Sequence, residues 1–525
     1  MDRASFTWIS SLASLTCFAL VACSGGPEGT TETTDSETDP TTDATTEGPD
    51  PTTTTVDPST SSPTTSSTTE PETTTTDPTT GSETTGPPPD CVAADGEVDD
   101  ACDAATPFCK GGECVACAEF DGQGDAACAG QSADTPVCEQ NSATCVECTP
   151  DADELCSGAT PICDELTYSC DKCTEHTQCG TTACNIEAGI CFPEDTVLYV
   201  DKNAGDCDNA DGSEAMPFCT IQAAFDHAVM QNALGAWTIW IAPGVYTQDT
   251  LSTPGMGTKL ALLGAGGQVT VQSSNNDQNA ANFAIATGDT VYMRDFNLSN
   301  HNTYHGFKCE SGVAWIDDSR FNDNEQHGVY SIDCTLYMRR SIVYSNKNGG
   351  IVIHGTNSMD DPVSRFETVF ITENGSAQAA FGGIQVADNH NLDISYSSIL
   401  VNITNGGFSS MQCVNQGAIN IRNSVVVALA GQSFSCDGVV INNSAVDELV
   451  DAGMNNIMAL ASDVDAWFTY QNPGIYNAEA MVNDEPSPLT DLAVWVDGDP
   501  RMDFNGDLRP MTDGTPTFAG ADIPN

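Results

Sequence analysis

The chain has 525 residues, and its 75 acidic and 15 basic residues give a formal net charge of −60. Such an acidic chain cannot neutralise many phosphates, which excludes nucleic acid as its partner, and it is not attracted to anionic lipid. The 24 cysteines indicate an oxidising compartment, where disulfides form and persist. The length allows several domains, and composition alone divides the chain into four regions.

Residues 1–22 have the pattern of a secretory signal peptide. Arg3 precedes an apolar run that is too short to span a bilayer permanently. The run ends in Leu20-Val21-Ala22-Cys23, which resembles the lipobox of bacterial lipoproteins. The resemblance implies cleavage before Cys23, acylation of its thiol and anchoring in the lipid membrane, and Ser24 favours the outer membrane by the family's sorting rule. An ordinary signal peptide with an incidental Cys23 is the alternative.

Residues 23–90 form a linker of Thr, Ser, Pro, Gly and acidic residues, and 24–90 contain no Lys or Arg. A segment with so little apolar surface cannot offset its chain entropy, so we expect it to be disordered. Proline and like charges should extend it. It is either a stalk that holds the rest of the chain away from the membrane or a plain spacer.

Residues 91–192 contain sixteen cysteines in four repeats of four, an internal regularity that indicates tandem modules. The sets are Cys91, Cys102, Cys109 and Cys114; Cys117, Cys128, Cys138 and Cys145; Cys148, Cys156, Cys163 and Cys170; and Cys173, Cys179, Cys184 and Cys191. Modules this small need covalent cross-links in place of a core. The CxxC pairs bridge two modules, unlike zinc knuckles. We therefore expect two local disulfides per repeat, in any of three pairings.

Residues 196–525 begin with a strand-like run, Val197–Val200, a helical pattern after the N-cap candidate Thr220, and the segment Thr238–Tyr246, which reads as strand, turn and strand. This order resembles the start of right-handed parallel β-helix proteins of the pectate-lyase-like superfamily, in which a short helix caps the open end of the coil. The tail from Ser487 to Ala521 resembles that of bacterial surface β-helix domains. The resemblance implies an all-β solenoid.

The body of this region repeats independently of the resemblance. A Ser/Thr-x-apolar unit recurs every 20–30 residues, beginning at Ser319, Ser341, Thr368, Ser398, Ser424 and Ser444. Such a period with strands and no helices predicts a β-solenoid. Asn324 and Asn346 at matching turns should stack as an amide ladder. Asp318, Arg340 and Glu367 precede three of the units, so Arg340 is expected between the two acids on neighbouring coils.

Three cysteine pairs in this region are close in sequence: Cys207 with Cys219, Cys309 with Cys334, and Cys413 with Cys436. The last two pairs are separated by about one coil. Neighbouring coils lie about 4.8 Å apart, within the Cα distance that a disulfide tolerates. We therefore predict that these two pairs join successive coils and that Cys207–Cys219 closes a loop before the helix.

No residue is assigned to catalysis or to a cofactor. Asp317-Asp318 and His327-Gly328 faintly resemble the "DD…HG" elements of galacturonan hydrolases, but the repeat itself explains them better. The turn 503–507 has alternating oxygens that would suit calcium, although it lacks further ligands and fits a capped turn better.

Basic and aromatic residues are concentrated in one stretch, where a single face for acidic sugars is one interpretation and a paired structural surface the other. They are Arg294, Lys308, Arg320, Arg339, Arg340, Lys347 and Arg365, with Tyr292, Tyr304, Trp315, Tyr330, Tyr337 and Tyr344. Two functions follow. One is a surface-anchored β-helix domain that serves as a binding or structural module for extracellular glycan or matrix. The other is a surface polysaccharide lyase or glycoside hydrolase. Carboxylates converging with basic residues in one groove would favour the second.

Overall fold

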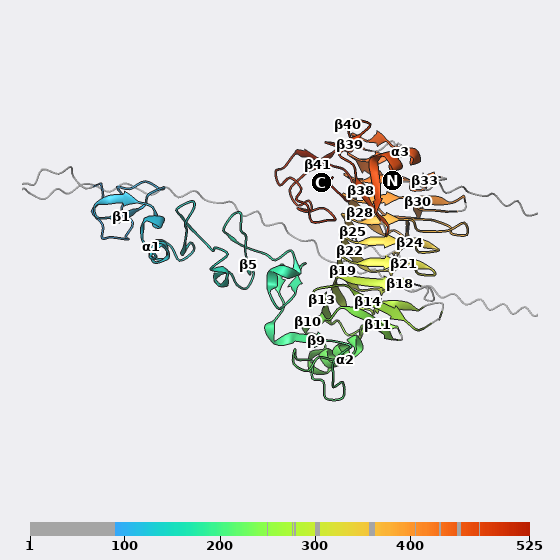
Figure 1. Ribbon diagram of the computed structural model, residues 1–525, viewed down its shortest axis with the longest axis horizontal. Coiled ribbons are helices and arrows are strands. Elements are labelled where there is room, and N and C mark those ends of the chain that lie inside the picture. Colours follow the sequence, from blue (N-terminus) through green and yellow to red (C-terminus); the bar gives the residue numbers. More distant parts are fainter. Residues whose placement is uncertain are drawn as a thin grey trace, which may run out of the picture. The chain divides into compact units, whose positions relative to one another are not determined.

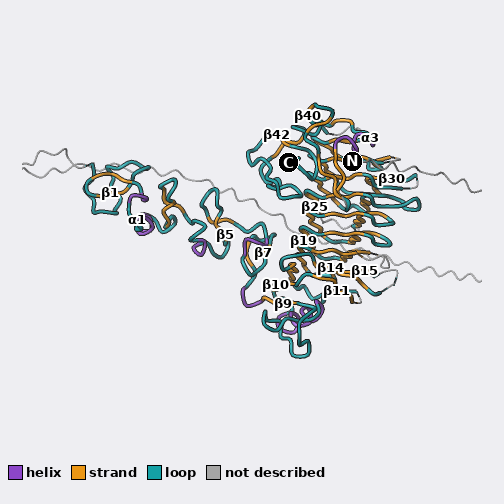
Figure 2. The backbone as a smooth tube through the Cα atoms, viewed as in Figure 1, coloured by secondary structure: helices purple, strands orange, loops and turns teal. Residues whose placement is uncertain are grey.

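The computed structural model describes residues 90–524, except for positions 249, 276, 278–279, 300–304, 356–362, 405, 430–431, 449–452 and 472. The expected signal peptide, Cys23 and the linker up to residue 89 lie outside the described residues. The described residues belong to one compact unit, 86–525. Loops dominate the cysteine repeats, whereas strands dominate the region from residue 197 onwards (Figure 2).

Each cysteine repeat is built on one short antiparallel hairpin. The hairpins are β1 (Phe108–Lys110) with β2 (Glu113–Val115), β3 (Val137–Glu139) with β4 (Thr144–Val146), β5 (Ile162–Cys163) with β6 (Cys170–Asp171), and β7 (Cys184–Asn185) with β8 (Ile190–Cys191). The third and fourth cysteines face each other across the strands. The second repeat also contains helix α1 (Gly124–Gln131).

All sixteen cysteines of the repeats are in disulfides, and every repeat uses the same pairing. The first cysteine bonds to the third and the second to the fourth, over sequence separations of 11 to 21 residues. Three sulfur atoms lie within 4.8 Å of one another in each repeat, but they belong to disulfides and offer no thiolate to a metal ion. The disulfides cross-link modules that have few buried apolar residues.

The remainder is a parallel β-helix with three long sheets (Figure 1). The first sheet contains β9 (Val197–Val200), β10 (Ala236–Ile241), β13 (Lys259–Gly264), β16 (Thr290–Arg294), β19 (Val313–Asp317), β22 (Thr335–Arg339), β25 (Val363–Glu367), β28 (Asn391–Ser395), β31 (Ile419–Arg422) and β34 (Val440–Asn442). The second contains β11 (Gly244–Gln248), β14 (Val269–Ser273), β17 (Phe296–Ser299), β20 (Arg320–Asn322), β23 (Ile342–Tyr344), β26 (Phe370–Thr372), β29 (Ser398–Leu400), β32 (Val425–Val427), β35 (Ala445–Val446) and β36 (Ile457–Met458). The third contains β12 (Leu251–Ser252), β15 (Ala281–Ile285), β18 (His305–Glu310), β21 (His327–Ile332), β24 (Gly349–His354), β27 (Ile384–Ala387), β30 (Phe408–Val414) and β33 (Gln432–Phe434).

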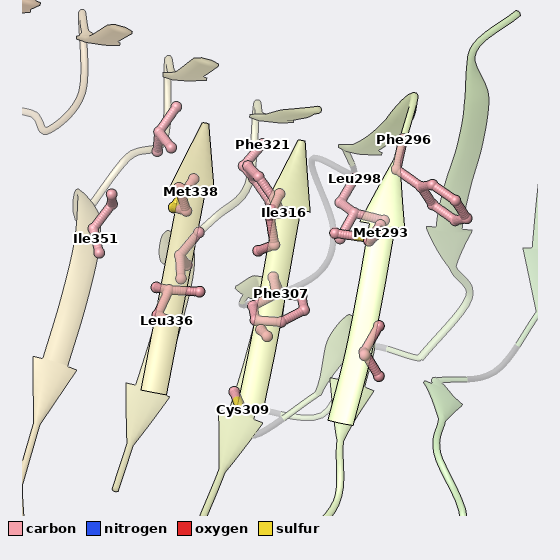
Figure 3. Close-up of a cluster of buried hydrophobic side chains, with 14 of the residues drawn as sticks. Met293, Phe296, Leu298, Phe307, Cys309, Ile316, Phe321, Leu336, Met338 and Ile351 are labelled. Carbon is pink, nitrogen blue, oxygen red and sulfur yellow. The ribbon is translucent and has the colours of Figure 1, made fainter. Parts of the chain in front are cut away.

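Identical positions of successive coils stack directly, so the core is a set of side-chain columns. One inner column of the first sheet runs through Leu262, Met293, Ile316, Met338, Phe366, Ile394 and Ile421, all of which are fully buried. Figure 3 shows Met293, Ile316 and Met338 on successive strands. Each such side chain contributes about 1.5–3 kcal/mol of burial free energy, which explains the apolar alternation in the repeat.

Polar ladders fix the register between coils. Asn324 donates to Asn346 at 2.8 Å, Asn346 to Asn374 at 2.9 Å, and Asn374 to Asn402 at 3.1 Å, so the expected amide ladder extends over four coils. Buried amides need such partners, and the ladder supplies them.

A serine column supports the corner before the second sheet, but its register differs from the expected one at two coils. Strand pairing aligns Ser341, Val369 and Ser397, rather than Thr368 and Ser398. The reason is that the coils differ in length. The Ser397 hydroxyl binds the N–H of Val369, 28 residues earlier, whereas Ser341 and Ser319 are bonded over 22 residues. Each serine hydroxyl of this column accepts a backbone N–H from the preceding coil. The serines are Ser319, Ser341, Ser397, Ser424 and Ser444.

Helix α2 (Ile221–Asn232) covers the N-terminal end of the β-helix (Figure 1). Thr220 is its N-cap, with its hydroxyl accepting the Ala223 N–H at 3.2 Å, as the sequence predicts. Ile221, Phe225 and Ala228 are fully buried against the first coils. No helix among the described residues is long and apolar enough to cross a membrane.

The three sequence-close cysteine pairs of the β-helix are disulfides in the structure. Cys413–Cys436 and Cys309–Cys334 join neighbouring coils at Cα distances of 4.9 and 5.9 Å. Cys207–Cys219, with a Cα distance of 5.6 Å, closes the loop before α2.

The last residues do not add coils. After β36, α3 (Ala461–Trp467) and the hairpins β37 (Phe468–Gln471) with β38 (Ile475–Ala478), β39 (Met481–Val482) with β40 (Glu485–Pro486), and β41 (Ala493–Trp495) with β42 (Thr515–Thr517) form a C-terminal segment. This segment packs Trp467, Leu489 and Phe518 against outer-face residues of the second sheet such as Phe370 and Leu400. From β23 to β35 the second sheet is therefore apolar on both faces.

Candidate functional site

The outer face of the first sheet carries two parallel columns of side chains that run along the coil axis. The first column continues from aromatic to polar residues in strict register: Tyr292, Trp315, Tyr337, Arg365, Asp393 and Asn420. The second is charged: Arg294, Asp317, Arg339, Glu367, Ser395 and Arg422. In the later coils, the outward side chains of the first sheet are therefore polar or charged, and they do not form an apolar layer.

The aromatic part of the first column is a stack. The rings of Trp315 and Tyr337 lie 3.8 Å apart between centroids with planes inclined by 14°, and Tyr292 lies parallel to Trp315 at 6.3 Å. Tyr292 is fully buried, whereas Trp315 and Tyr337 are half-buried. The exposed Arg365 follows Tyr337 on the next coil, with its Nε 3.8 Å from Asp393.

The fourth cysteine repeat packs on this face and covers the start of the aromatic column. The Trp240 indole donates to the Thr181 carbonyl at 2.7 Å, and the Tyr292 hydroxyl bonds to Asn185 Oδ1 at 2.7 Å. Phe192 packs edge-on against Tyr292, and Ala183 lies in the same buried cluster. These contacts join the repeat to the solenoid through both apolar and polar groups.

An ionic cluster extends this contact. Arg339 binds Asp317 through two hydrogen bonds of 2.7 and 2.6 Å and donates to the Thr174 carbonyl. Arg340 binds Asp318 at 3.0 Å and reaches both oxygens of Glu175 at 3.1 and 2.9 Å. Burial by itself raises the pKa of Asp317, but the two guanidinium groups outweigh it and hold that pKa at about 2. Burial raises the pKa of Asp318 despite Arg340.

Two adjoining clefts lie over the C-terminal part of the charged column. One has a volume of about 630 Å³ and is bounded by the third and fourth repeats, the sheet and residues 495–502 of the C-terminal segment. The other has a volume of about 380 Å³ and includes Arg365, Asp393 and Arg422. Both are lined by Glu367 and Gly498, so we treat them as one groove.

Glu367 is at the centre of this groove. Its carboxyl group makes no hydrogen bond or ion pair with any described residue, because the fork of Arg339 is turned to Asp317 and that of Arg422 to Asp499. Burial raises the pKa of Glu367, and Arg339 and Arg422 only partly oppose this effect. The groove therefore presents a carboxyl group that is free to interact with a ligand.

Asp499 supports the opposite wall. It is buried and binds Arg422, the Tyr396 hydroxyl at 3.0 Å and the Val496 N–H at 3.0 Å. Burial, together with Asp499, raises the pKa of Tyr396, so this tyrosine is a neutral donor. The C-terminal segment is thereby fixed to the sheet beside the groove.

The expected charge ladder is correct in one half and wrong in the other. Arg340 pairs with Asp318 as predicted. Glu367, however, is aligned with Arg339, because Asp318 and Arg340 occupy the left-handed corner, φ 48° and 43°, and Thr368 follows them there with φ 54°. The side chain of Arg340 turns to Glu175 instead.

The basic and aromatic residues do not form one face. Arg339, Arg340 and Arg365 line the groove. Trp315 and Tyr337 are on the same sheet but line neither cleft. Three others lie elsewhere: Lys308 and Tyr330 on the third sheet, with Lys308 paired to Glu310, and Tyr344 beneath the C-terminal segment. Arg320 is on the second sheet, Lys347 pairs with Glu325 on a turn, and Arg294 pairs with Asp295. Tyr304 lies outside the described residues.

The resemblance to hydrolase elements has no structural counterpart. Asp317 and Asp318 are in ion pairs on the first sheet, whereas His327 is on the third sheet, where its ring stacks on His305 and Phe381. Burial lowers the pKa of His305 to about 4 and that of His327 to about 3, so both rings are neutral packing groups.

The acidic turn 503–507 is a capped turn. One oxygen of Asp503 accepts the N–H groups of Asn505 and Asp507, and the other accepts that of Ile523. Because three backbone donors point at this buried carboxylate, its oxygens are not directed at a cation.

Sequence reasoning missed Glu175 and Asp499, which hold the two walls of the groove. Glu175 is the second residue after the first cysteine of its repeat. The first and third repeats have Ala93 and Pro150 at this position, so the carboxylate is not common to all repeats. Asp499 gave no sequence signal.

Comparison with known proteins gives three results. Residues 77–197 match a family of unknown function (DUF8331). No curated protein matches the chain. Among solved structures, the chain is similar to "pectate lyase Pel9A", with 15% sequence identity, a TM-score of 0.38, and coverage of 63% of this chain and 96% of that chain.

Proposed function

We propose that the chain is a cell-surface lipoprotein, anchored in the bacterial outer membrane through acylated Cys23, whose β-helix domain binds an extracellular glycan in the groove. The observation that supports binding is the row of Arg365 and Asp393, which line the groove, with the half-buried Tyr337 next to Arg365 on the preceding coil. Rings stack on the apolar faces of pyranoses, and Arg and Asp bond to their hydroxyl and carboxyl groups. Successive coils are about 4.8 Å apart, close to the length of one sugar in an extended chain.

The charge of the molecule limits which glycans suit it. A net charge of −60 repels an acidic polymer at long range, but salt screens this repulsion beyond about 8 Å at physiological ionic strength. Within the groove, Arg365 is 58% exposed and is available to a carboxylate. Uronate-containing glycans are therefore the proposed ligands.

Titration calorimetry with polygalacturonate and with neutral galactan tests glycan binding. Tyr337→Ala should weaken binding about tenfold or more if a sugar on this ring contributes as much as a stacked nucleobase does, about 1–3 kcal/mol. Tyr470→Ala, which removes an exposed tyrosine of the C-terminal segment, is the matched control. Absence of binding to every glycan in the panel, or equal loss in both variants, would reject the groove as a glycan site.

Anchoring is tested separately. The wild-type chain should fractionate with membranes and incorporate labelled palmitate, and Cys23→Ala should remain an uncleaved precursor or be released. Soluble wild-type protein without label would contradict the anchor.

A second function, polysaccharide lyase or glycoside hydrolase, is favoured by one observation: the unpaired carboxyl of Glu367 lies among arginines in an open groove. Such groups are candidates for proton transfer. Release of reducing ends or of unsaturated products from polygalacturonate distinguishes the two enzyme classes from each other and from binding alone.

A further inference from the structure

Glu367 differs from the other buried and half-buried carboxylates in and beside the groove in having no partner among the described residues, whereas the cleft-lining Asp171 and Asp497 are exposed at the rim. Asp317, Asp318, Glu175 and Asp499 are each bound to an arginine, and Asp393 faces Arg365 and accepts the Asn420 amide at 2.8 Å. Of these six buried or half-buried carboxylates, five are therefore neutralised by an arginine and one, Glu367, is not.

The position of Glu367 makes this difference important for a ligand. Of the two residues that line both clefts, Glu367 and Gly498, Glu367 is the one with an ionisable group. On the next two coils it is followed by Ser395 and Arg422. A glycan that spans the groove along the coil axis must pass this carboxyl group. We infer that Glu367 is the specificity-determining residue of the groove, and that its protonation state decides whether an anionic glycan is accepted.

The physical reason is electrostatic. As a carboxylate, Glu367 repels a uronate or sulfate group at short range in a partly desolvated site, where like charges cost far more than in water. As a neutral acid it donates a hydrogen bond to the same group, while Arg365 supplies a positive charge. A neutral glycan bonds to either form. Burial stabilises the neutral form of Glu367 and raises its pKa. The change between the neutral and the charged form therefore takes place at a higher pH than for an ordinary glutamate.

The charged groups that line the two clefts enter this balance; besides those named next, they are Asp164, Asp171, Lys172, Glu175, Arg340, Asp497 and Arg501. Its own strand contributes Arg365, the preceding coil Arg339, and the following coils Asp393 and Arg422. Asp499 approaches from the C-terminal segment. Their pairing with one another is maintained across neutral pH, because guanidinium groups stay protonated in proteins. Glu367 is thus the half-buried carboxyl of this set that has no ion-paired arginine, so only the longer-range attraction of Arg339, Arg422 and Arg365 favours its ionised form.

This inference rests on glycan binding in the groove, and the test separates the two. The full chain is titrated with polygalacturonate and with its fully methyl-esterified form at fixed ionic strength, from pH 5 to pH 8. Affinity for polygalacturonate should fall about tenfold or more as the pH rises and Glu367 ionises, and affinity for the esterified polymer should not change. Glu367→Gln should remove the dependence, and Asp497→Asn, which removes an exposed carboxylate at the rim, should keep it.

The outcomes are distinct. If neither polymer binds at any pH, the proposed function fails. If both bind but the pH dependence is absent, or persists in Glu367→Gln, the role of Glu367 is overturned and the groove remains a glycan site. Circular dichroism of each variant verifies that the β-helix is intact.

Discussion

Arg340 and Glu175 lie 165 residues apart in the chain and are joined by two hydrogen bonds of 3.1 and 2.9 Å. The first residue is at a corner of the solenoid and the second is in a cysteine repeat. Their side chains are 12% and 20% exposed, so the pair is largely removed from water. The fourth repeat is therefore part of the β-helix surface, and the groove has one wall from a different module.

Glu175→Gln should loosen this repeat. Arg340 keeps Asp318 as its partner, so the loss is that of the charge-assisted hydrogen bonds to Glu175, about 1.5–3 kcal/mol. Hydrogen exchange of residues 173–191 should become faster while the inner strands β16 and β19 keep their protection. Glu187→Gln, an exposed glutamate of the same repeat, is the control. Equal exchange in both variants would show that the ionic contact does not hold the repeat.

Acid should release the same contact in a defined range. The folded-state pKa of Asp317 is lowered from the ordinary 3.8 to about 2. Its stabilising contribution is complete above the ordinary pKa and is lost as the pH falls through the folded value. Fluorescence of Trp240 and Trp315, which lie under the repeat, should change between about pH 4 and pH 2. Asp317→Asn should abolish that step, and a step of unchanged midpoint in this variant would assign it to another group.

The disulfide Cys413–Cys436 should stabilise its two coils locally. Closing a loop of 23 residues is worth about 3 kcal/mol of denatured-state entropy. The double variant Cys413→Ser/Cys436→Ser should accelerate exchange in β30 and β33. Loss of Cys207–Cys219, a loop of 12 residues, should act near α2 instead. Identical exchange maps for the two double variants would contradict this local role.

Two adjacent serines distinguish the observed register from the one expected from the repeat. The Ser397 hydroxyl accepts the Val369 N–H at 3.2 Å, whereas the Ser398 hydroxyl accepts the Ala521 N–H at 3.0 Å. Each bond is worth about 1 kcal/mol. Ser397→Ala should therefore weaken coil-to-coil contacts, and Ser398→Ala should free the end of the C-terminal segment. Limited proteolysis after residue 487 that is faster in Ser397→Ala than in Ser398→Ala would contradict the register.

The sequence predicted the solenoid because a coil repeats its own pattern of apolar, serine and asparagine positions. Asn324 and Asn346 and the cysteine couples were identifiable for that reason. The alignment of Ser397 with Ser341 was not identifiable, because loop lengths change between coils and shift the apparent period by one residue. The groove was only partly identifiable. Arg365 and Tyr337 could be named, but Glu175 and Asp499 come from segments outside the repeat, and no periodic pattern relates them to the sheet.

The position of the fourth repeat also determines how the molecule carries mechanical load. A pull applied from the N-terminal side reaches residue 173 before it reaches β9. It is then carried by the Arg340–Glu175 and Tyr292–Asn185 contacts on the flank of the solenoid. These contacts share the load in shear across several coils, so the terminal strand is not peeled from the end of the sheet. A chain held by its N-terminus in flowing liquid would keep its first coils folded for this reason.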